Sequence, residues 1–147
     1  MKDFIIIGNL NSTLYAEVFP LIQDKKVKMG FTRIHFNGEG AFRFQIRGGG
    51  EKVIDNAHWF TTLPVTSPKK LELNKSISDG YEMVDEIDAI SVSNVKDIPK
   101  DYYGTVATSM YVLCYDLNEW DIVGKLITPH IDGKPIYKRI LIRRKNK

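Results

Sequence analysis

The sequence predicts an α+β fold, in which one strand-helix unit forms the incomplete edge of an α/β sheet and a mostly antiparallel β region follows. The first observation is the unbroken apolar run from Phe4 to Ile7, closed by Gly8, which is typical of a strand buried on both faces. The second is that only one helical pattern follows it before short alternating segments begin. We therefore expect residues 1–31 to be a remnant of a sheet and residues 32–147 to form one compact β region.

The helical pattern covers residues 12–26. Ser12 is the expected N-cap, because its side-chain oxygen can accept free backbone N–H groups of the first turn. Asn9 and Asn11 lie in the turn before it. Pro20 is expected to bend this helix or to end its first half, since it removes one backbone hydrogen bond. Apolar residues recur at helical spacing at Leu14, Val18, Leu21 and Ile22.

Alternating apolar residues then predict a series of strands. Asn37-Gly38-Glu39-Gly40 and Asp132-Gly133 are turn signals of the hairpin type. A mixed apolar segment covers residues 106–115, and one helical turn is expected over residues 116–120. In the last strand, Ile140 and Ile142 should share one face and Arg139, Leu141 and Arg143 the other. The expected strands are residues 41–46, 57–63, 88–95, 121–127 and 136–144.

Composition excludes several classes of protein. The single cysteine, Cys114, lies in an apolar run, so we expect a buried thiol, no disulfide within the chain and a reducing compartment. No segment approaches the roughly 20 apolar residues of a membrane span, and the start has no signal-peptide pattern. The sequence therefore predicts a cytoplasmic protein that does not bind membranes.

Positive charge is concentrated at the C-terminus. Seven basic and no acidic residues follow Gly133, which leaves 14 basic against 18 acidic residues in the rest of the chain. Basic side chains on a strand can contact DNA phosphates and gain affinity from counterion release, although a solvated tail would show the same composition. The predicted DNA-binding residues are Lys134, Lys138, Arg139, Arg143 and Arg144.

Three other patterns were weighed for chemistry. Residues 36–40 fit a Phe-x-Gly-x-Gly motif of S-adenosylmethionine sites, but a strand rather than a helix should follow, which favours a hairpin turn. The three histidines have no metal-binding spacing, so no metal is expected. Asp85, Glu86 and Asp88 form an acidic cluster that suggests either catalytic carboxylates or a solvated turn, and we favour the turn.

Seven stretches of the chain resemble the C-terminal part of the EcoRI-like adenine-specific DNA methyltransferases. The stretch from Val95 to Tyr102 and the ending from Ile140 to Arg144 are the most specific of them. The chain departs from the pattern at Ala107-Thr108-Ser109, where relatives carry a Val-Pro pair. The matching stretches are residues 4–11, 19–22, 59–63, 88–90, 95–102, 122–124 and 132–144.

The resemblance implies methyl transfer from S-adenosylmethionine to the exocyclic nitrogen of an adenine that is flipped out of duplex DNA, within a restriction-modification system. In this family an Asn-Pro-Pro-Phe motif, placed before the strand at Phe4, holds the base. The chain contains no Pro-Pro pair. We therefore expect no catalytic residue and no cofactor in this chain, while the intact enzyme would use S-adenosylmethionine.

On this reading residues 1–31 complete a methyltransferase sheet and residues 32–147 recognise the target. The expected partners are DNA, an upstream catalytic piece and, through the apolar first strand, a second copy of the chain. The resemblance thus implies a C-terminal fragment or a separately encoded half of such a methyltransferase, and a stand-alone interaction module without enzymatic role is the alternative. The resemblance suggests target-recognition residues Trp59, Phe60, Lys100, Asp101 and Tyr102, and a sheet turn near the active site at Asn9 and Asn11.

Overall fold

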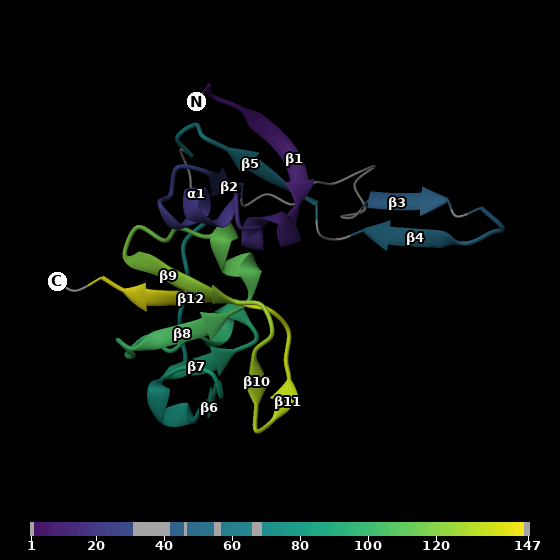
Figure 1. Ribbon diagram of the computed structural model, residues 1–147. Coiled ribbons are helices and arrows are strands. Elements are labelled where there is room, and N and C mark those ends of the chain that lie inside the picture. The colour runs from purple at the N-terminus through teal and green to yellow at the C-terminus, as the bar shows by residue number, and fades with distance from the viewer. Residues whose placement is uncertain (1, 31–41, 46, 55–56, 66–68, 146–147) are drawn as a thin grey trace. The chain divides into compact units, whose positions relative to one another are not determined.

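The computed structural model describes residues 2–30, 42–45, 47–54, 57–65 and 69–145. The chain forms two compact units, residues 1–67 and residues 68–147 (Figure 1). The sequence had suggested a division after residue 31. The structure places it after Ser67, because strand β5 (Ala57–Thr61) returns to pair with the two strands of the first thirty residues.

The first unit contains a three-stranded antiparallel sheet. β5 lies at its centre, flanked by β1 (Ile5–Asn9) and β2 (Lys28–Met29). The 3-10 helix η1 (Leu10–Leu14) and the helix α1 (Phe19–Gln23) connect the two outer strands. A separate hairpin of β3 (Phe42–Gln45) and β4 (Glu51–Ile54) turns at residues 47–50, where three successive glycines adopt positive φ.

The prediction that the first strand is buried in a parallel sheet is wrong for this unit. β1 pairs antiparallel with β5, and Ile5, Ile6 and Ile7 are 60%, 51% and 52% exposed. Since neighbouring side chains of a strand point to opposite faces, both faces of β1 are uncovered. Within the described residues β1 has one strand neighbour, so it is the edge of the sheet.

The single helix expected over residues 12–26 is replaced by the two short helices η1 and α1. Pro20 lies in the first turn of α1, where a missing N–H costs nothing, and so it begins a helix instead of bending one. Asn9 rather than Ser12 caps η1, because its Oδ1 accepts the Asn11 N–H at 2.8 Å.

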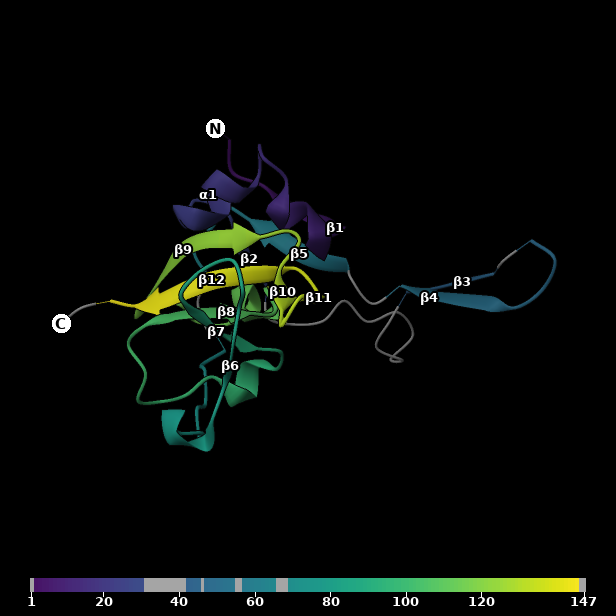
Figure 2. The same ribbon diagram turned by 60° about the horizontal axis from the view of Figure 1, so that its bottom comes forward.

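The second unit is built on a five-stranded sheet with the order β6-β7-β8-β12-β9 (Figure 2). β7 and β8 are parallel, and the other pairs are antiparallel. The strands are β6 (Glu82–Met83), β7 (Ala89–Val92), β8 (Thr105–Thr108), β9 (Trp120–Leu126) and β12 (Arg139–Arg144). The 3-10 helices are η2 (Ile77–Asp79), η3 (Val95–Asp97) and η4 (Met110–Cys114).

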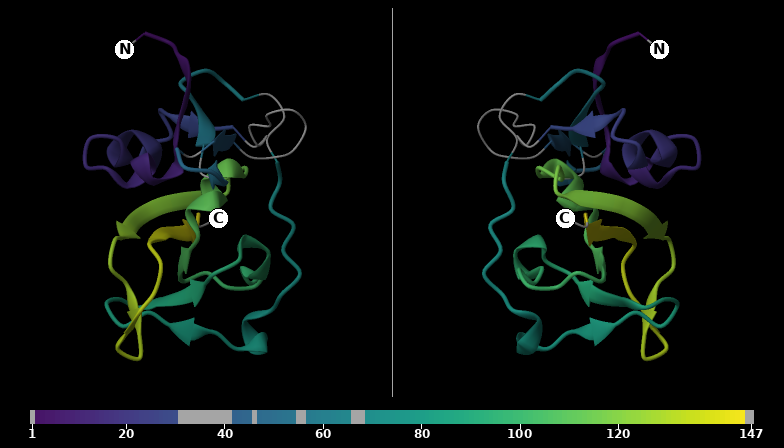
Figure 3. Two further views of the ribbon diagram at one scale, coloured as in Figure 1. Left: turned by 90° about the vertical axis from the view of Figure 1, so that its right-hand side faces the viewer. Right: turned by 90° about the vertical axis from the view of Figure 1, so that its left-hand side faces the viewer.

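A hairpin of β10 (His130–Ile131) and β11 (Lys134–Pro135) leaves this sheet between β9 and β12, and residues 69–76 run beside the unit as an extended segment (Figure 3). One face of the sheet contributes Val106, Ile140 and Ile142 to the core, each 0% exposed. The other face carries smaller side chains, where Ala89 and Ala107 pack with Leu141. Both faces of β12 are therefore buried along most of its length.

Most predicted β elements of the second unit are confirmed. β7, β9 and β12 fall within the strands expected at residues 88–95, 121–127 and 136–144, allowing one residue at the start of β9. The Asp132-Gly133 turn is confirmed as type I′, with φ of 49° and 77°. Residues 106–115 contain the end of β8 and η4, and Cys114 is buried as expected.

Of the remaining predicted elements, one is wrong, two are confirmed and one falls outside the described residues. The helical turn expected at residues 116–120 is wrong, because that segment is a non-helical turn in which Asp116 Oδ1 accepts the Asn118 N–H. In the first unit, β3 and β5 confirm the strands expected at residues 41–46 and 57–63. The Phe-x-Gly-x-Gly stretch and its turn at residues 36–40 lie outside the described residues. No helix in the described part of the chain has the length and apolar character needed to cross a membrane.

Candidate nucleic-acid interface

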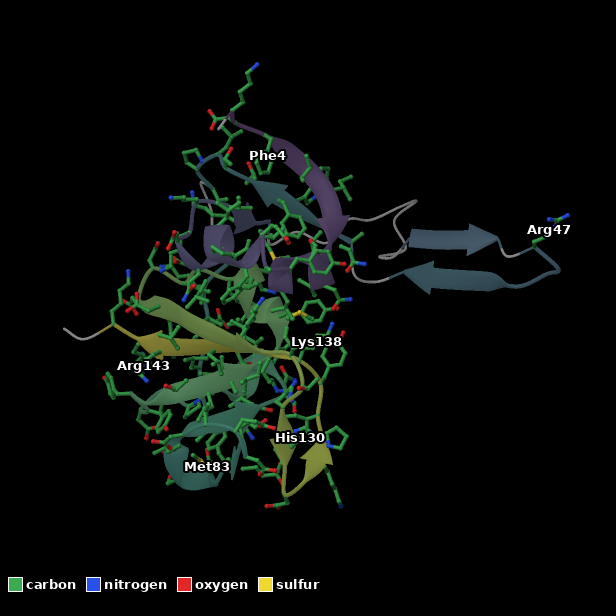
Figure 4. All side chains as sticks on the ribbon, viewed as in Figure 1. Phe4, Arg47, Met83, His130, Lys138 and Arg143 are labelled. Carbon is green, nitrogen blue, oxygen red and sulfur yellow. The ribbon has the colours of Figure 1, made fainter. Side chains whose placement is uncertain are left out.

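The predicted DNA-binding residues do not form one continuous patch. Figure 4 shows Lys138 and Arg143 at opposite ends of β12. They are five positions apart in sequence, which corresponds to about 17 Å along a strand. The alternation expected for this strand is present, with Ile140 and Ile142 on one face and Arg139 and Leu141 on the other. Each basic side chain therefore has its own environment.

Arg143 is an exposed residue, and two nitrogens of its guanidinium group donate hydrogen bonds to Thr105. Its Nη2 donates to Thr105 Oγ1 at 2.6 Å and its Nε at 3.2 Å. Thr105 begins the neighbouring strand β8, so this contact orients the guanidinium across the sheet. Because Arg143 as a whole is exposed and a guanidinium has five N–H donors, it can also bind an anion.

Arg144 serves mainly to join two segments of the second unit. Its Nη2 donates to the carbonyl of Lys100 at 2.8 Å. Its guanidinium lies 4.6 Å from the ring centroid of Trp120 and 5.6 Å from that of Tyr103. These cation–π contacts and the carbonyl hydrogen bond hold the loop before β8 against the end of β12.

Arg139 is buried, with only 6% of its surface exposed. Its Nη2 donates to Ser93 Oγ at 3.0 Å, while its Nε is buried and has no partner among the described residues. Burial lowers the pKa of the Arg139 guanidinium, and no carboxylate raises it again. The sequence predicted this arginine as a DNA-binding residue, but it is a buried cation that no carboxylate among the described residues pairs with.

Lys134 is exposed on the β10–β11 hairpin, which Asp85 holds in place. The two carboxylate oxygens of Asp85 accept the backbone N–H groups of Asp132 at 3.0 Å and Gly133 at 2.8 Å. The hairpin tip is thereby fixed to the turn between β6 and β7. Asp85 belongs to the acidic cluster, and its carboxylate is engaged in this structural role.

Glu86, the next residue of the cluster, binds His130 at the start of the hairpin. Its Oε2 accepts the His130 backbone N–H at 3.0 Å, and its Oε1 lies 2.5 Å from His130 Nδ1. The backbone hydrogen bond is the main cause, and the side-chain contact the second, by which the pKa of Glu86 is lowered. The arrangement agrees with a structured turn and not with a pair of catalytic carboxylates.

The loop before β8 holds three of the suggested target-recognition residues. Asp101 accepts Ser76 Oγ–H at 2.6 Å and the Ile77 N–H at 2.7 Å, and these two bonds lower its pKa. Tyr102 is half-buried and folds back over Gly104, where an added Cβ would lie 2.3 Å from the tyrosine oxygen. Lys100 is exposed, so it is the residue of this group with a free side chain toward solvent.

The other suggested residues lie in the first unit. Phe60 is 3% exposed and packs against Gly8, where an added Cβ would lie 2.9 Å from the phenyl ring. Trp59 is half-buried beside Gly30. Asn9 and Asn11 are brought together by the cap of η1, in the turn that follows β1. The suggested recognition residues are thus divided between the two units.

A groove of about 440 Å³ on the second unit was not predicted from sequence. Three lysines, Lys69, Lys70 and Lys96, line it together with Tyr115, and Lys69 Nζ lies 5.0 Å from the centroid of that ring. Asn74 adds an amide, and Glu72 is the one acidic lining residue. Lys96 is distant from the other two lysines in sequence, so only the fold reveals the group. No three His, Cys, Asp or Glu side chains gather as metal ligands in the described part of the chain.

Comparison with known proteins identifies relatives of this chain. A family model described as "Adenine-specific methyltransferase EcoRI" matches residues 1–129. The type II methyltransferase M.EcoRI of Escherichia coli is 32% identical, over 98% of this chain and 51% of that protein. M.MpnI of Mycoplasma pneumoniae is 24% identical, over 88% and 46%. M.MgeORF184P of Mycoplasma genitalium is also 24% identical, over 97% and 57%.

No solved structure matches the chain. The chain spans about half the length of the curated relatives it matches. The family model nevertheless covers most of its 147 residues, from β1 to the start of the β10–β11 hairpin. The chain therefore belongs to the EcoRI family of adenine-specific methyltransferases.

Proposed function

We propose that this chain is the C-terminal, target-recognition part of an adenine-specific DNA methyltransferase, which binds duplex DNA and acts together with the catalytic part of such an enzyme. One observation carries the proposal: relatives of the family align with nearly the whole chain, yet the chain spans about half of their length. The half of the relatives that this sequence does not span would supply the S-adenosylmethionine site and the Asn-Pro-Pro-Phe motif, since this sequence has no Pro-Pro pair.

The uncovered strand β1 supports a protein partner. Ile5, Ile6 and Ile7 expose apolar side chains on both faces of an edge strand. Full burial of one such side chain is worth about 1.5–3 kcal/mol, so a partner that covers all three gains substantial affinity. A catalytic part with an α/β sheet offers both a strand edge and apolar surfaces to do so.

Two groups of cations support DNA as the second partner. The groove lined by Lys69, Lys70 and Lys96 carries a local excess of positive charge beside Tyr115. Arg143 and Lys138 add donors at the two ends of β12. Cations spread over a surface suit a duplex, because each phosphate contact releases about one counterion.

Selection from a randomised duplex pool tests this function in the isolated chain. A target-recognition part should enrich one short motif that contains adenine, and binding should weaken steeply between 50 mM and 200 mM salt. Calorimetry should show no binding of S-adenosylmethionine. Failure to retain DNA at low salt, or stoichiometric binding of the cofactor, would contradict the proposal, and retention without an enriched motif would limit the role to non-specific binding.

A further inference from the structure

Arg139 differs from the other arginines of β12 in the groups that surround its guanidinium. Arg144 lies against two aromatic rings and a carbonyl oxygen, and Arg143 reaches solvent. Arg139 is 6% exposed, and its Nη2 donates to the neutral hydroxyl of Ser93. In the described structure the Nε atoms of Arg139 and Arg144 are both buried without a hydrogen-bond partner, so what sets Arg139 apart is the lack of the aromatic rings that Arg144 contacts.

A buried cation of this kind is costly to the folded chain. Removing a charged group from water destabilises the folded chain unless an opposite charge compensates it. A guanidinium offers five N–H donors, and each buried donor without an acceptor destabilises the chain further. An apolar side chain of similar volume would avoid this cost, so the position is better suited to binding than to packing.

The sheet register shows how an anion can reach this group. Thr108 pairs with both Ile140 and Val92, which places Ser93 and Arg139 one residue further along at the same end of the sheet. Ser93 is exposed and lies just after β7, so it marks the edge at which Arg139 meets solvent. Lys138 precedes Arg139 and supplies a second cation at this edge.

We propose that Arg139 and Ser93 form a receptor for a backbone phosphate of DNA, an inference that rests on the proposed DNA-binding function. The planar guanidinium fork matches two oxygens of a phosphodiester, whose single negative charge supplies the missing counter-charge. The Ser93 hydroxyl accepts from Arg139 Nη2 and can donate its own proton to a phosphate oxygen. Lys138 then adds a longer-range attraction for the same strand.

The decisive variant is Arg139→Met, which keeps the volume and removes the charge. Its unfolding temperature without DNA should equal or exceed that of the unmodified chain, while its DNA affinity should fall at least tenfold at 50 mM salt. The slope of log affinity against log salt should also decrease by about 0.9, the value of one phosphate contact. Arg139→Lys should fall between the two, because it retains charge without the fork.

Arg47→Met is the matched control, since Arg47 is an exposed arginine at the tip of the β3–β4 hairpin (Figure 4). It should leave the affinity and the unfolding temperature unchanged. A less stable Arg139→Met chain that binds DNA normally would show a structural arginine and overturn the receptor. If Arg139→Met does not fold, the DNA affinity of Ser93→Ala is measured instead. Reduced affinity supports the receptor, and unchanged affinity overturns it.

Two further measurements distinguish free phosphate from DNA as the ligand, and failure of the Arg139 receptor from failure of the proposed DNA-binding function. Inorganic phosphate that stabilises the unmodified chain as strongly as duplex DNA, at equal ionic strength, would indicate a site for free phosphate and overturn a DNA contact. If the unmodified chain binds DNA and Arg139→Met binds it equally well, the receptor fails while the proposed function stands. If the unmodified chain binds no DNA, both fail.

Discussion

The carboxylate of Glu86 binds both the imidazole and the backbone of His130, with Oε1 2.5 Å from Nδ1 and Oε2 3.0 Å from the backbone nitrogen. The two residues are 44 positions apart, and their contact fixes the first residue of the β10–β11 hairpin to the turn before β7. Asp85 binds the hairpin tip in the same way. Lys134 on β11 therefore lies on a hairpin that two carboxylates, those of Glu86 and Asp85, bind to the turn before β7.

Docking of this hairpin should depend on pH. The pKa of Glu86 lies below its ordinary value of 4.5 in the folded chain, so its stabilising contribution is complete above that value. It should be lost as pH falls through the lower, folded pKa. Hydrogen exchange of the His130 amide should therefore accelerate below about pH 4.5 relative to amides of β12.

Glu86→Gln should expose the same amide at neutral pH, because a neutral amide is a weaker acceptor than a carboxylate. Asp88→Asn is the control: it removes one charge from the same acidic cluster but no hydrogen bond to the hairpin described above. Unchanged protection of the His130 amide in Glu86→Gln would show that the Glu86 carboxylate is not what holds the start of the hairpin.

Self-association through β1 is a second expectation. Ile5→Glu with Ile7→Glu should shift the chain toward monomer, since two apolar side chains that are 60% and 52% exposed are replaced by charges that repel those of a second copy. Sedimentation at several concentrations would measure this. Ile127→Glu, which alters an isoleucine that is 44% exposed on the second unit, should leave the distribution unchanged. A monomeric unmodified chain at high concentration would contradict the expectation.

The lysine groove should contribute to DNA affinity without sequence preference. Replacing Lys69, Lys70 and Lys96 together with Ala should lower the salt slope by up to about 2.7, because each phosphate contact accounts for about 0.9. Lys2, Lys25 and Lys26 in the first unit provide a control with the same change of net charge. An equal loss in both triple variants would indicate a general charge effect and no defined groove contact.

The buried strand β12 should dominate the stability of the second unit. Ile142 is 0% exposed on the central part of the sheet, so Ile142→Ala should lower the free energy of unfolding by about 2–5 kcal/mol. Urea denaturation followed by the fluorescence of Trp120 in the same unit would measure this loss. Ile127→Ala, at an exposed position, should change it by less than about 0.5 kcal/mol.

Elements governed by local chemistry were predictable from sequence. Asp132-Gly133 specifies its own type I′ turn, and the alternation around Ile140 and Ile142 specifies their shared buried face. The family could also be identified from short stretches of sequence. These features need no knowledge of which distant segment packs against them.

Features that depend on distant partners were not predictable. The apolar run of β1 gave no sign that its neighbour is β5, more than forty residues away, or that its side chains stay uncovered in this unit. Alternation placed Arg139 on the correct face, but a pattern of charged and apolar letters cannot show that this face is buried. Lys69 and Lys96 likewise share a groove only because the fold joins their segments.

The central position of β5 in the first unit has a consequence for how the chain is made. β1 and β2 both pair with β5, so neither can join this sheet until Thr61 has left the ribosome. At a synthesis rate of about 5–20 residues per second, β1 waits roughly 3 to 10 s for its partner. During that interval the backbone N–H and C=O groups of β1 are unpaired along both edges of the strand, so the nascent chain is open to pairing with other chains.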